Sequence, residues 1–177
     1  FSGSAVSAAA NSDSDYITSV NFTNDGTYLS GVYAGCTPAL INAGVEQCGR
    51  IAVLRGSETL ADDAAVRTGD TVRLLSGSNV VQSLTVAVTG DVTGDGRVSA
   101  TDLLTVQMAI LGSVSLTGAN HKDALASGSA SLSASDVLAL SQYVLGINAP
   151  TKMDGFYNSD GYINAVPVFV GNPGLER

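Results

Sequence analysis

The chain has 177 residues, of which 45% are hydrophobic and 14% are charged, so it can bury one ordinary core or two small ones. Its net charge of −8 disfavours a nucleic-acid partner, because phosphates reward clustered Lys and Arg. It contains no run of about 18 apolar residues, so we expect no membrane-spanning helix.

The first half of the chain has the pattern of a small β domain. Residues 1–14 are small and polar and are predicted to be a linker or a loosely held first strand. Residues 15–89 are predicted to form a small β-sandwich. Its candidate strands are YITSVNF, TYLSGVY, RIAVL, DTVRLL and VVQSLTVAV, separated by turn-forming residues. One short helix is expected after Cys36, since Thr37 suits an N-cap and Pro38 the first helical turn.

Two cysteines, Cys36 and Cys48, flank this helix. A disulfide between them would contribute about 3 kcal/mol and would suit an exported protein. The alternative is a pair of buried free thiols in a reducing compartment. With a single His and no CxxC motif, a zinc site is disfavoured. The chain begins at Phe1 without a visible signal peptide, so we expect a fragment or a mature form.

The stretch GDVTGDGRVSATD, from Gly90 to Asp102, combines three aspartates with a turn-forming glycine, Gly96. The spacing is that of an EF-hand-type calcium loop, and hard oxygen ligands favour calcium over zinc or copper. The predicted ligands are the side chains of Asp91, Thr93, Asp95, Ser99 and Asp102 and the backbone carbonyl of Arg97. Val98 is expected to point into the helical core. The alternative is a solvated turn in which Asp102 is a helix N-cap.

The same scheme recurs 34 residues further on. Two helices are predicted, over TDLLTVQMAILG and SASDVLALSQYVLG, each with apolar residues at helical spacing and a C-terminal glycine. The shift places Ser99 on Ser133 and Asp102 on Asp136, which indicates an internal duplication. The second loop has Leu125, Ser127 and Ser129 at ligand positions and Ala130 in place of the turn glycine. We therefore expect one calcium ion and a metal-free second loop; the alternative is that Asp123 reaches into that loop.

Together, GDVTGDGRVSATDLLTVQMAILG and SLSASDVLALSQYVLG resemble a type I dockerin, a duplicated module of calcium loop and helix. We assign residues 90–150 to this module. The family usually has Asn or Asp where this chain has Thr93. The segment before it resembles, more weakly, the small β modules (X-modules or immunoglobulin-like domains) that precede dockerins. The implied fold class is multidomain β plus α: a small β-sandwich followed by an all-α, duplicated, EF-hand-like dockerin.

The resemblance implies a non-catalytic function. A dockerin binds a cohesin module of a scaffold protein in a calcium-dependent manner, which would anchor the parent protein in a secreted, cellulosome-like complex that degrades polysaccharide. We expect a monomer when the protein is free. By the same resemblance, partner binding falls on matching faces of the two helices. These residues are Ala100, Thr101, Leu104, Gln107 and Met108 in the first repeat and Ala134, Ser135, Leu138, Ser141 and Gln142 in the second.

Other classes of function are weighed against this one. An enzyme is disfavoured, because His121, the single histidine, lies in a polar connector and no facing carboxylate pair or nucleophile motif is visible. A carbohydrate-binding module needs aromatic platforms, for which the sequence offers Tyr28 and Tyr33 and no Trp. A third possibility is a calcium-stiffened spacer of a cell-surface protein that binds nothing.

Residues 151–177 form a tail rich in aromatic residues, which we expect to pack on the rest of the chain. The aromatic residues are Phe156, Tyr157, Tyr162 and Phe169. The stretch GFYNSDGYINAV is either a decayed third repeat or a hairpin around Asp160 and Gly161.

Overall fold

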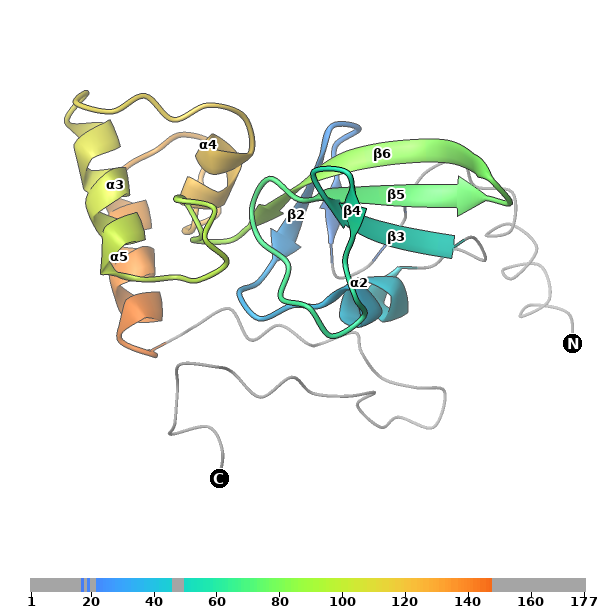
Figure 1. The fold of residues 1–177 in the computed structure, drawn as a ribbon. Coiled ribbons are helices and arrows are strands. Elements are labelled where there is room, and N and C mark those ends of the chain that lie inside the picture. The colour runs from blue at the N-terminus through green and yellow to red at the C-terminus, as the bar shows by residue number, and fades with distance from the viewer. Residues whose placement is uncertain (1–16, 18, 20–21, 46–49, 148–177) are drawn as a thin grey trace, which may run out of the picture.

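The computed structural model describes residues 17, 19, 22–45 and 50–147 (Figure 1). Within these ranges, six strands form one mixed sheet in the order β1-β2-β6-β5-β3-β4. The strands are β1 Thr23–Asn24, β2 Tyr28–Val32, β3 Arg50–Arg55, β4 Glu58–Thr59, β5 Thr71–Ser76 and β6 Asn79–Val88. Strands β2 and β6 pair in parallel, and the other neighbouring strands pair antiparallel.

The single sheet shows that the predicted fold class is wrong. A β-sandwich needs two sheets that face each other. Here β6 pairs with β2 on one side and with β5 on the other, so the six strands belong to one sheet. The core of this sheet also includes Leu40 and Ile41 of helix α2, Pro38–Gly44. The described residues form a mixed six-stranded sheet with four short helices, not a sandwich followed by an all-α module.

Helix α2 begins where the sequence predicts it. The Thr37 hydroxyl accepts a hydrogen bond from the Leu40 amide at 3.3 Å, and Pro38 is the first helical residue. Cys36, just before the helix, is fully buried. Cys48 lies outside the described residues, so the disulfide between them stays a prediction.

Four of the five candidate strands correspond closely to β2, β3, β5 and β6. Of the first candidate, YITSVNF, only Ile17, Ser19 and Phe22 are described, and none of these three lies in a strand. The predicted linker at 1–14 and the tail at 151–177 lie outside the described residues.

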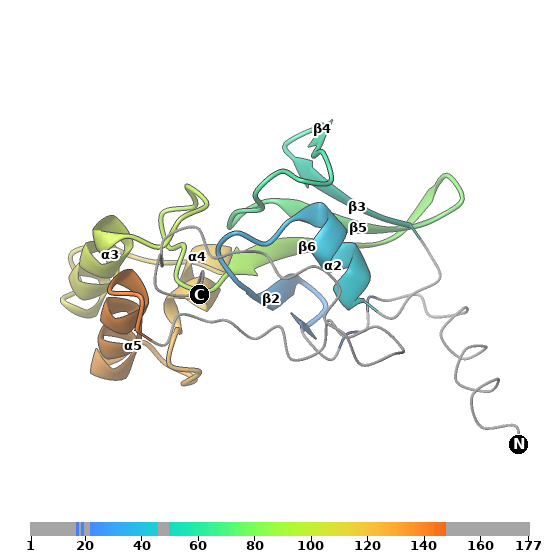
Figure 2. The same cartoon turned by 90° about the horizontal axis from the view of Figure 1, so that it is seen from below.

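The second half of the chain contains helices α3 Ala100–Ile110, α4 Gly118–Ala124 and α5 Ala134–Val144. The two predicted helices are α3 and α5, which contact each other (Figure 2). Helix α4 was not predicted: it forms in the connector that the sequence suggested to be polar, and it packs against β2 and β6. It lies between the sheet and the pair α3 and α5 (Figures 1 and 2). None of the helices in the described ranges is long and apolar enough to cross a membrane.

A second hydrophobic core forms where the first loop and the helices meet. Its buried members are Val92, Val106, Ala124 and Leu140, and Val98 packs against them as predicted. Some apolar residues at helical spacing in α3 and α5 do not join it. Ile110, Leu111 and Leu145 are exposed, because they lie at the C-terminal ends of α3 and α5.

We predict that Leu140→Ala destabilises the protein strongly and that Leu138→Ala, on the same helix, does not. Leu140 is fully buried, whereas 60% of Leu138 is exposed. Removing a core leucine side chain costs about 2–5 kcal/mol, and a surface change typically stays within about 0.5 kcal/mol. Urea unfolding in excess calcium, followed by circular dichroism, measures both variants. Equal effects would contradict the position of the second core.

Candidate metal centre and exposed helix faces

The loop between β6 and α3 folds around the carboxylate of Asp91, which is fully buried. Its Oδ1 accepts a hydrogen bond from the Asp95 amide at 2.9 Å, and its Oδ2 accepts one from the Gly96 amide at 3.0 Å. Gly96 has φ of 89°, a left-handed conformation that allows the sharp turn the sequence predicts. Burial raises the pKa of Asp91 to about 6, and the charge of Asp102 adds to the rise while amide hydrogen bonds oppose it.

Asp102 closes the loop from the first turn of α3. Its Oδ1 accepts hydrogen bonds from the amide and the hydroxyl of Thr93, both at 2.9 Å. Its Oδ2 accepts hydrogen bonds from the amide and the hydroxyl of Ser99, at 2.8 and 3.0 Å. Ser99 and Asp102 thereby form a capping box at the helix N-terminus. Asp102 therefore organises the whole loop as well as capping the helix.

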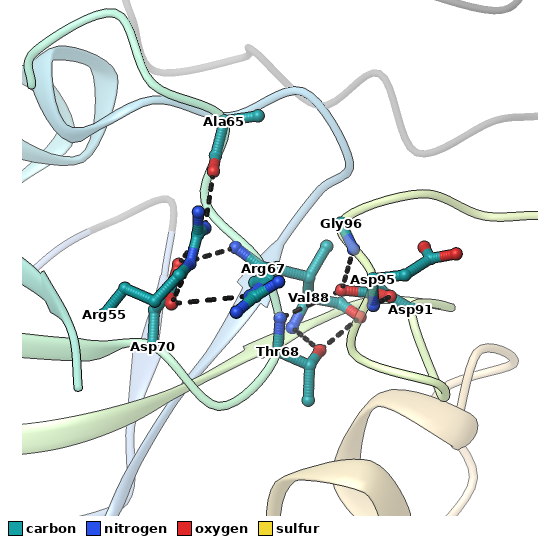
Figure 3. A network of polar contacts seen from close by, with 9 residues as sticks. All are labelled: Arg55, Ala65, Arg67, Thr68, Asp70, Val88, Asp91, Asp95 and Gly96. Atoms are coloured by element: carbon teal, nitrogen blue, oxygen red, sulfur yellow. Dashed lines mark hydrogen bonds and ion pairs between the residues drawn. The ribbon is translucent and has the colours of Figure 1, made fainter. Parts of the chain in front are cut away.

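The sheet also holds this loop (Figure 3). The Thr68 amide, in the turn before β5, donates a hydrogen bond to Asp91 Oδ2 at 2.9 Å. The Thr68 hydroxyl accepts a hydrogen bond from the Val88 amide at 2.9 Å, at the end of β6. Asp70, in the same turn, is buried and forms an ion pair with Arg55 at 2.8 Å. The turn that positions Asp91 is therefore fixed from within the sheet.

The second loop satisfies its carboxylate with serine side chains. Asp136 Oδ1 accepts hydrogen bonds from the amide and the hydroxyl of Ser127, at 3.0 and 2.7 Å. Its Oδ2 accepts them from the amide and the hydroxyl of Ser133, at 2.9 and 3.1 Å, and from the Ser129 hydroxyl at 3.3 Å. Thr93 and Ser99, 34 positions before Ser127 and Ser133, make the same contacts with Asp102, so the duplication extends to these hydrogen bonds.

The pKa of Asp136 reflects this arrangement. Burial tends to raise it, but the hydrogen bonds from Ser127 and Ser133 outweigh burial and hold the pKa below its usual value. An ionised Asp136 is thus stabilised by neutral donors of its own loop.

The first loop differs in its surplus of negative charge. In the described conformation, no three His, Cys, Asp or Glu side chains within the described ranges are arranged to hold a metal ion. The chemistry of the loop nevertheless fits a hard cation, and one orphaned group points the same way. Both carboxylate oxygens of Asp123, on α4, are buried and have no hydrogen-bond partner among the described residues. Burial raises the pKa of Asp123 to about 9; the nearby Thr68 hydroxyl, whose own hydrogen bonds are with Val88, lowers it, and the charges of Asp91 and Asp102 raise it further.

The predicted docking residues lie mainly on exposed faces of α3 and α5. Eight of the ten are exposed, and Ser141 and Gln142 are half-buried. Leu104 is 54% exposed and Leu138 is 60% exposed, so these two leucines are not core residues. Leu111 and Leu145, which are outside the predicted docking set, are also exposed, at 79% and 72%. The sequence signal for this pair is that the two leucines superpose under the same 34-residue shift.

Two loop-and-helix repeats, the first with an EF-hand-like acidic loop, form this part of the chain. Residues 89–145 match the family model of the dockerin type I domain, which supports the resemblance seen in the sequence. Such domains are non-catalytic, bind cohesins and generally bind calcium. No curated protein and no solved structure matches the chain.

We predict that Asp136→Asn destabilises the protein at neutral pH and that this effect fades in acid. Because folding lowers the pKa of Asp136, its charge contributes stability above the pKa of an unfolded aspartate, about 4, and this contribution is lost as the pH falls through the folded-state value. Hydrogen bonds to a charged group are worth about 1.5–3 kcal/mol. Urea unfolding in chelator at pH values near neutral and well below this pKa measures the change. Ser135→Ala, at an exposed position, is the control; a pH-independent effect would contradict the role of the Asp136 charge.

Proposed function

We propose that the chain is a calcium-dependent docking unit that binds a cohesin and attaches its parent protein to a secreted, cellulosome-like complex that degrades polysaccharide. The observation that carries the proposal is the contrast between the two loops. The first gathers carboxylates that need a cation, and the second satisfies its one carboxylate with hydroxyl groups. Both loops lead into helices with matching exposed faces.

The residues that would hold calcium are those of the first loop. They are the side chains of Asp91, Thr93, Asp95, Ser99 and Asp102 and the carbonyl of Arg97. The hydroxyls of Thr93 and Ser99 now donate to Asp102, and they can rotate to offer oxygen lone pairs to a cation instead. Calcium would supply the positive charge that these carboxylates lack and would tie the loop to α3. One ion per chain is proposed, because Asp136 already has its donors.

The docking surface would consist of the two matching helix faces. Each face combines small residues at the helix start with an exposed leucine one turn later, Leu104 in α3 and Leu138 in α5. An exposed leucine between small side chains suits a partner pocket, since buried apolar anchors dominate interface energies. The faces differ where Met108 is replaced by Gln142, so we propose one dominant binding orientation with α3 as the principal helix.

A carbohydrate-binding function has less support. Tyr33 is only 2% exposed, so its ring cannot stack on a sugar. The Tyr28 ring has the ammonium of Lys122 at 5.8 Å from its centre, which covers one face. Of the two tyrosines that the sequence offered as sugar platforms, Tyr33 is therefore buried and Tyr28 has one face of its ring covered.

The calcium assignment is tested with a matched pair of variants. Wild-type protein is expected to bind one calcium ion, and Asp95→Ala to weaken binding at least about tenfold, because it removes a charged ligand. Ser129→Ala, at the equivalent position of the second loop, should leave the affinity unchanged. Isothermal titration calorimetry gives both stoichiometry and affinity. Two ions per wild-type chain, or wild-type affinity in Asp95→Ala, would contradict the assignment.

The docking mode is tested by placing a bulky charge on each face. Thr101→Arg should weaken binding to a cohesin by more than about tenfold, whereas Ser135→Arg should have a small effect. Surface plasmon resonance against a panel of cohesins, with calcium or with chelator, measures both. If each single change leaves binding intact and the double change abolishes it, the two orientations are interchangeable. If no cohesin binds wild-type protein, the spacer function is favoured instead.

A further inference from the structure

Asp123 is a buried acid that the predicted ligand set leaves without a role. It lies near the end of α4, and 2% of the residue is exposed. Its backbone carbonyl accepts a hydrogen bond from the Gly90 amide at 2.9 Å, at the entrance to the first loop. Its carboxylate oxygens have no hydrogen-bond partner among the described residues. An ionised carboxylate in this position is strongly unfavourable unless a positive charge compensates it.

The surroundings of Asp123 belong to the first loop and not to the second. Besides burial, its pKa responds to the Thr68 hydroxyl, on the turn that holds Asp91, and to the charges of Asp91 and Asp102. Asp136, the carboxylate of the second loop, is surrounded by serine donors. The sequence left open that Asp123 reaches into the second loop. In the structure, the acidic residues that act on Asp123 are instead Asp91 and Asp102 of the first loop.

Protonation would remove the charge of Asp123, but it would not explain why the acid is there. A neutral carboxyl is still a polar group that lacks a hydrogen-bond partner. A buried apolar residue would pack here at lower cost, as the neighbouring Ala119 and Ala124 do on the same helix. A cation held by the first loop would supply the partner that the Asp123 carboxylate is missing.

We propose that Asp123 adds its carboxylate to the ligands of the calcium ion in the first loop, so that α4 is part of the metal centre. This inference rests on the proposed calcium function and extends its ligand set beyond the loop itself. Calcium would then join three parts of the fold. They are the loop, helix α4, and the sheet turn whose Thr68 amide holds Asp91.

Such a link has support in the packing of α4. Lys122, next to Asp123, forms an ion pair with Asp25 of the sheet domain at 2.5 Å. Asn120, on the same helix, donates a hydrogen bond to the Val92 carbonyl of the loop at 2.7 Å. The helix that carries Asp123 is thus fixed to the sheet on one side and to the loop on the other.

Affinity and stability together test the proposal. Asp123→Asn should weaken calcium binding at least about tenfold, because a charged ligand becomes a neutral one. In chelator, its melting temperature should not fall below that of the wild type, since without a cation the Asp123 carboxyl has no partner to lose. Asp25→Asn, which loosens the ion pair of α4 without touching the loop, should keep wild-type affinity. Wild-type affinity in Asp123→Asn, or a lower melting temperature in chelator, would overturn the proposal.

Coordination itself is measured with europium in place of calcium. Luminescence lifetimes in water and in heavy water count the water molecules bound to the ion. Asp123→Ala should gain about one coordinated water relative to wild type, because the vacated ligand position fills with solvent. An unchanged count would overturn the proposal even if the affinity falls.

The controls separate this inference from the function on which it rests. If wild-type protein binds neither calcium nor europium, the proposed function fails, and this inference fails with it. If wild-type protein binds one ion that needs Asp95 but not Asp123, the function stands and this inference alone is wrong.

Discussion

The crowding of buried carboxylates at the junction of the sheet, the first loop and α4 is the constraint on which the structure depends. Asp91, Asp102 and Asp123 are each at most 2% exposed, and no basic side chain forms an ion pair with them in the described ranges. Backbone amides and hydroxyls compensate Asp91 and Asp102, while Asp123 stays uncompensated. Like charges in a low-dielectric site repel strongly, so a cation bound here, as proposed, would relieve the repulsion.

The two repeats compensate their buried carboxylates in different ways. In the second, hydroxyl groups of Ser127, Ser129 and Ser133 surround the single carboxylate, and the loop is complete in any solution that leaves the fold intact. In the first, extra acidic groups would make the loop dependent on an ion, as proposed above. A duplicated module has thereby become asymmetric: one half would respond to the cation, and the other half would serve as a permanent support for it.

Much of the local structure follows from the sequence, because helix starts and periodic apolar positions are local signals. The cap at Thr37, the two long helices and their duplication are predicted in this way. The single sheet is not predicted from the sequence, because the parallel pairing of β2 with β6 joins distant segments. Hydrophobic periodicity does not show which strands pair. Helix α4 escapes prediction because a short GANHKDA segment has weak helix propensity and is stabilised by packing. The position of Asp123 is also not predicted from the sequence, because Asp91 and Asp102, which act on it, lie in the preceding repeat.

The passage from β6 into the first loop has a mechanical consequence. The Thr89 amide donates to the Val32 carbonyl at 2.7 Å, and the Gly90 amide donates to the Asp123 carbonyl at 2.9 Å, so the residues between the strand and Asp91 are fastened on both sides. There is no elastic segment between the sheet and the loop. A pulling force applied to the sheet would pass directly to the loop. A partner bound to α3 and α5 would therefore also fix the orientation of the sheet. If the module docks as proposed, the sheet would be held by its partner at a fixed angle as well as at a fixed distance, unlike a domain on a flexible linker.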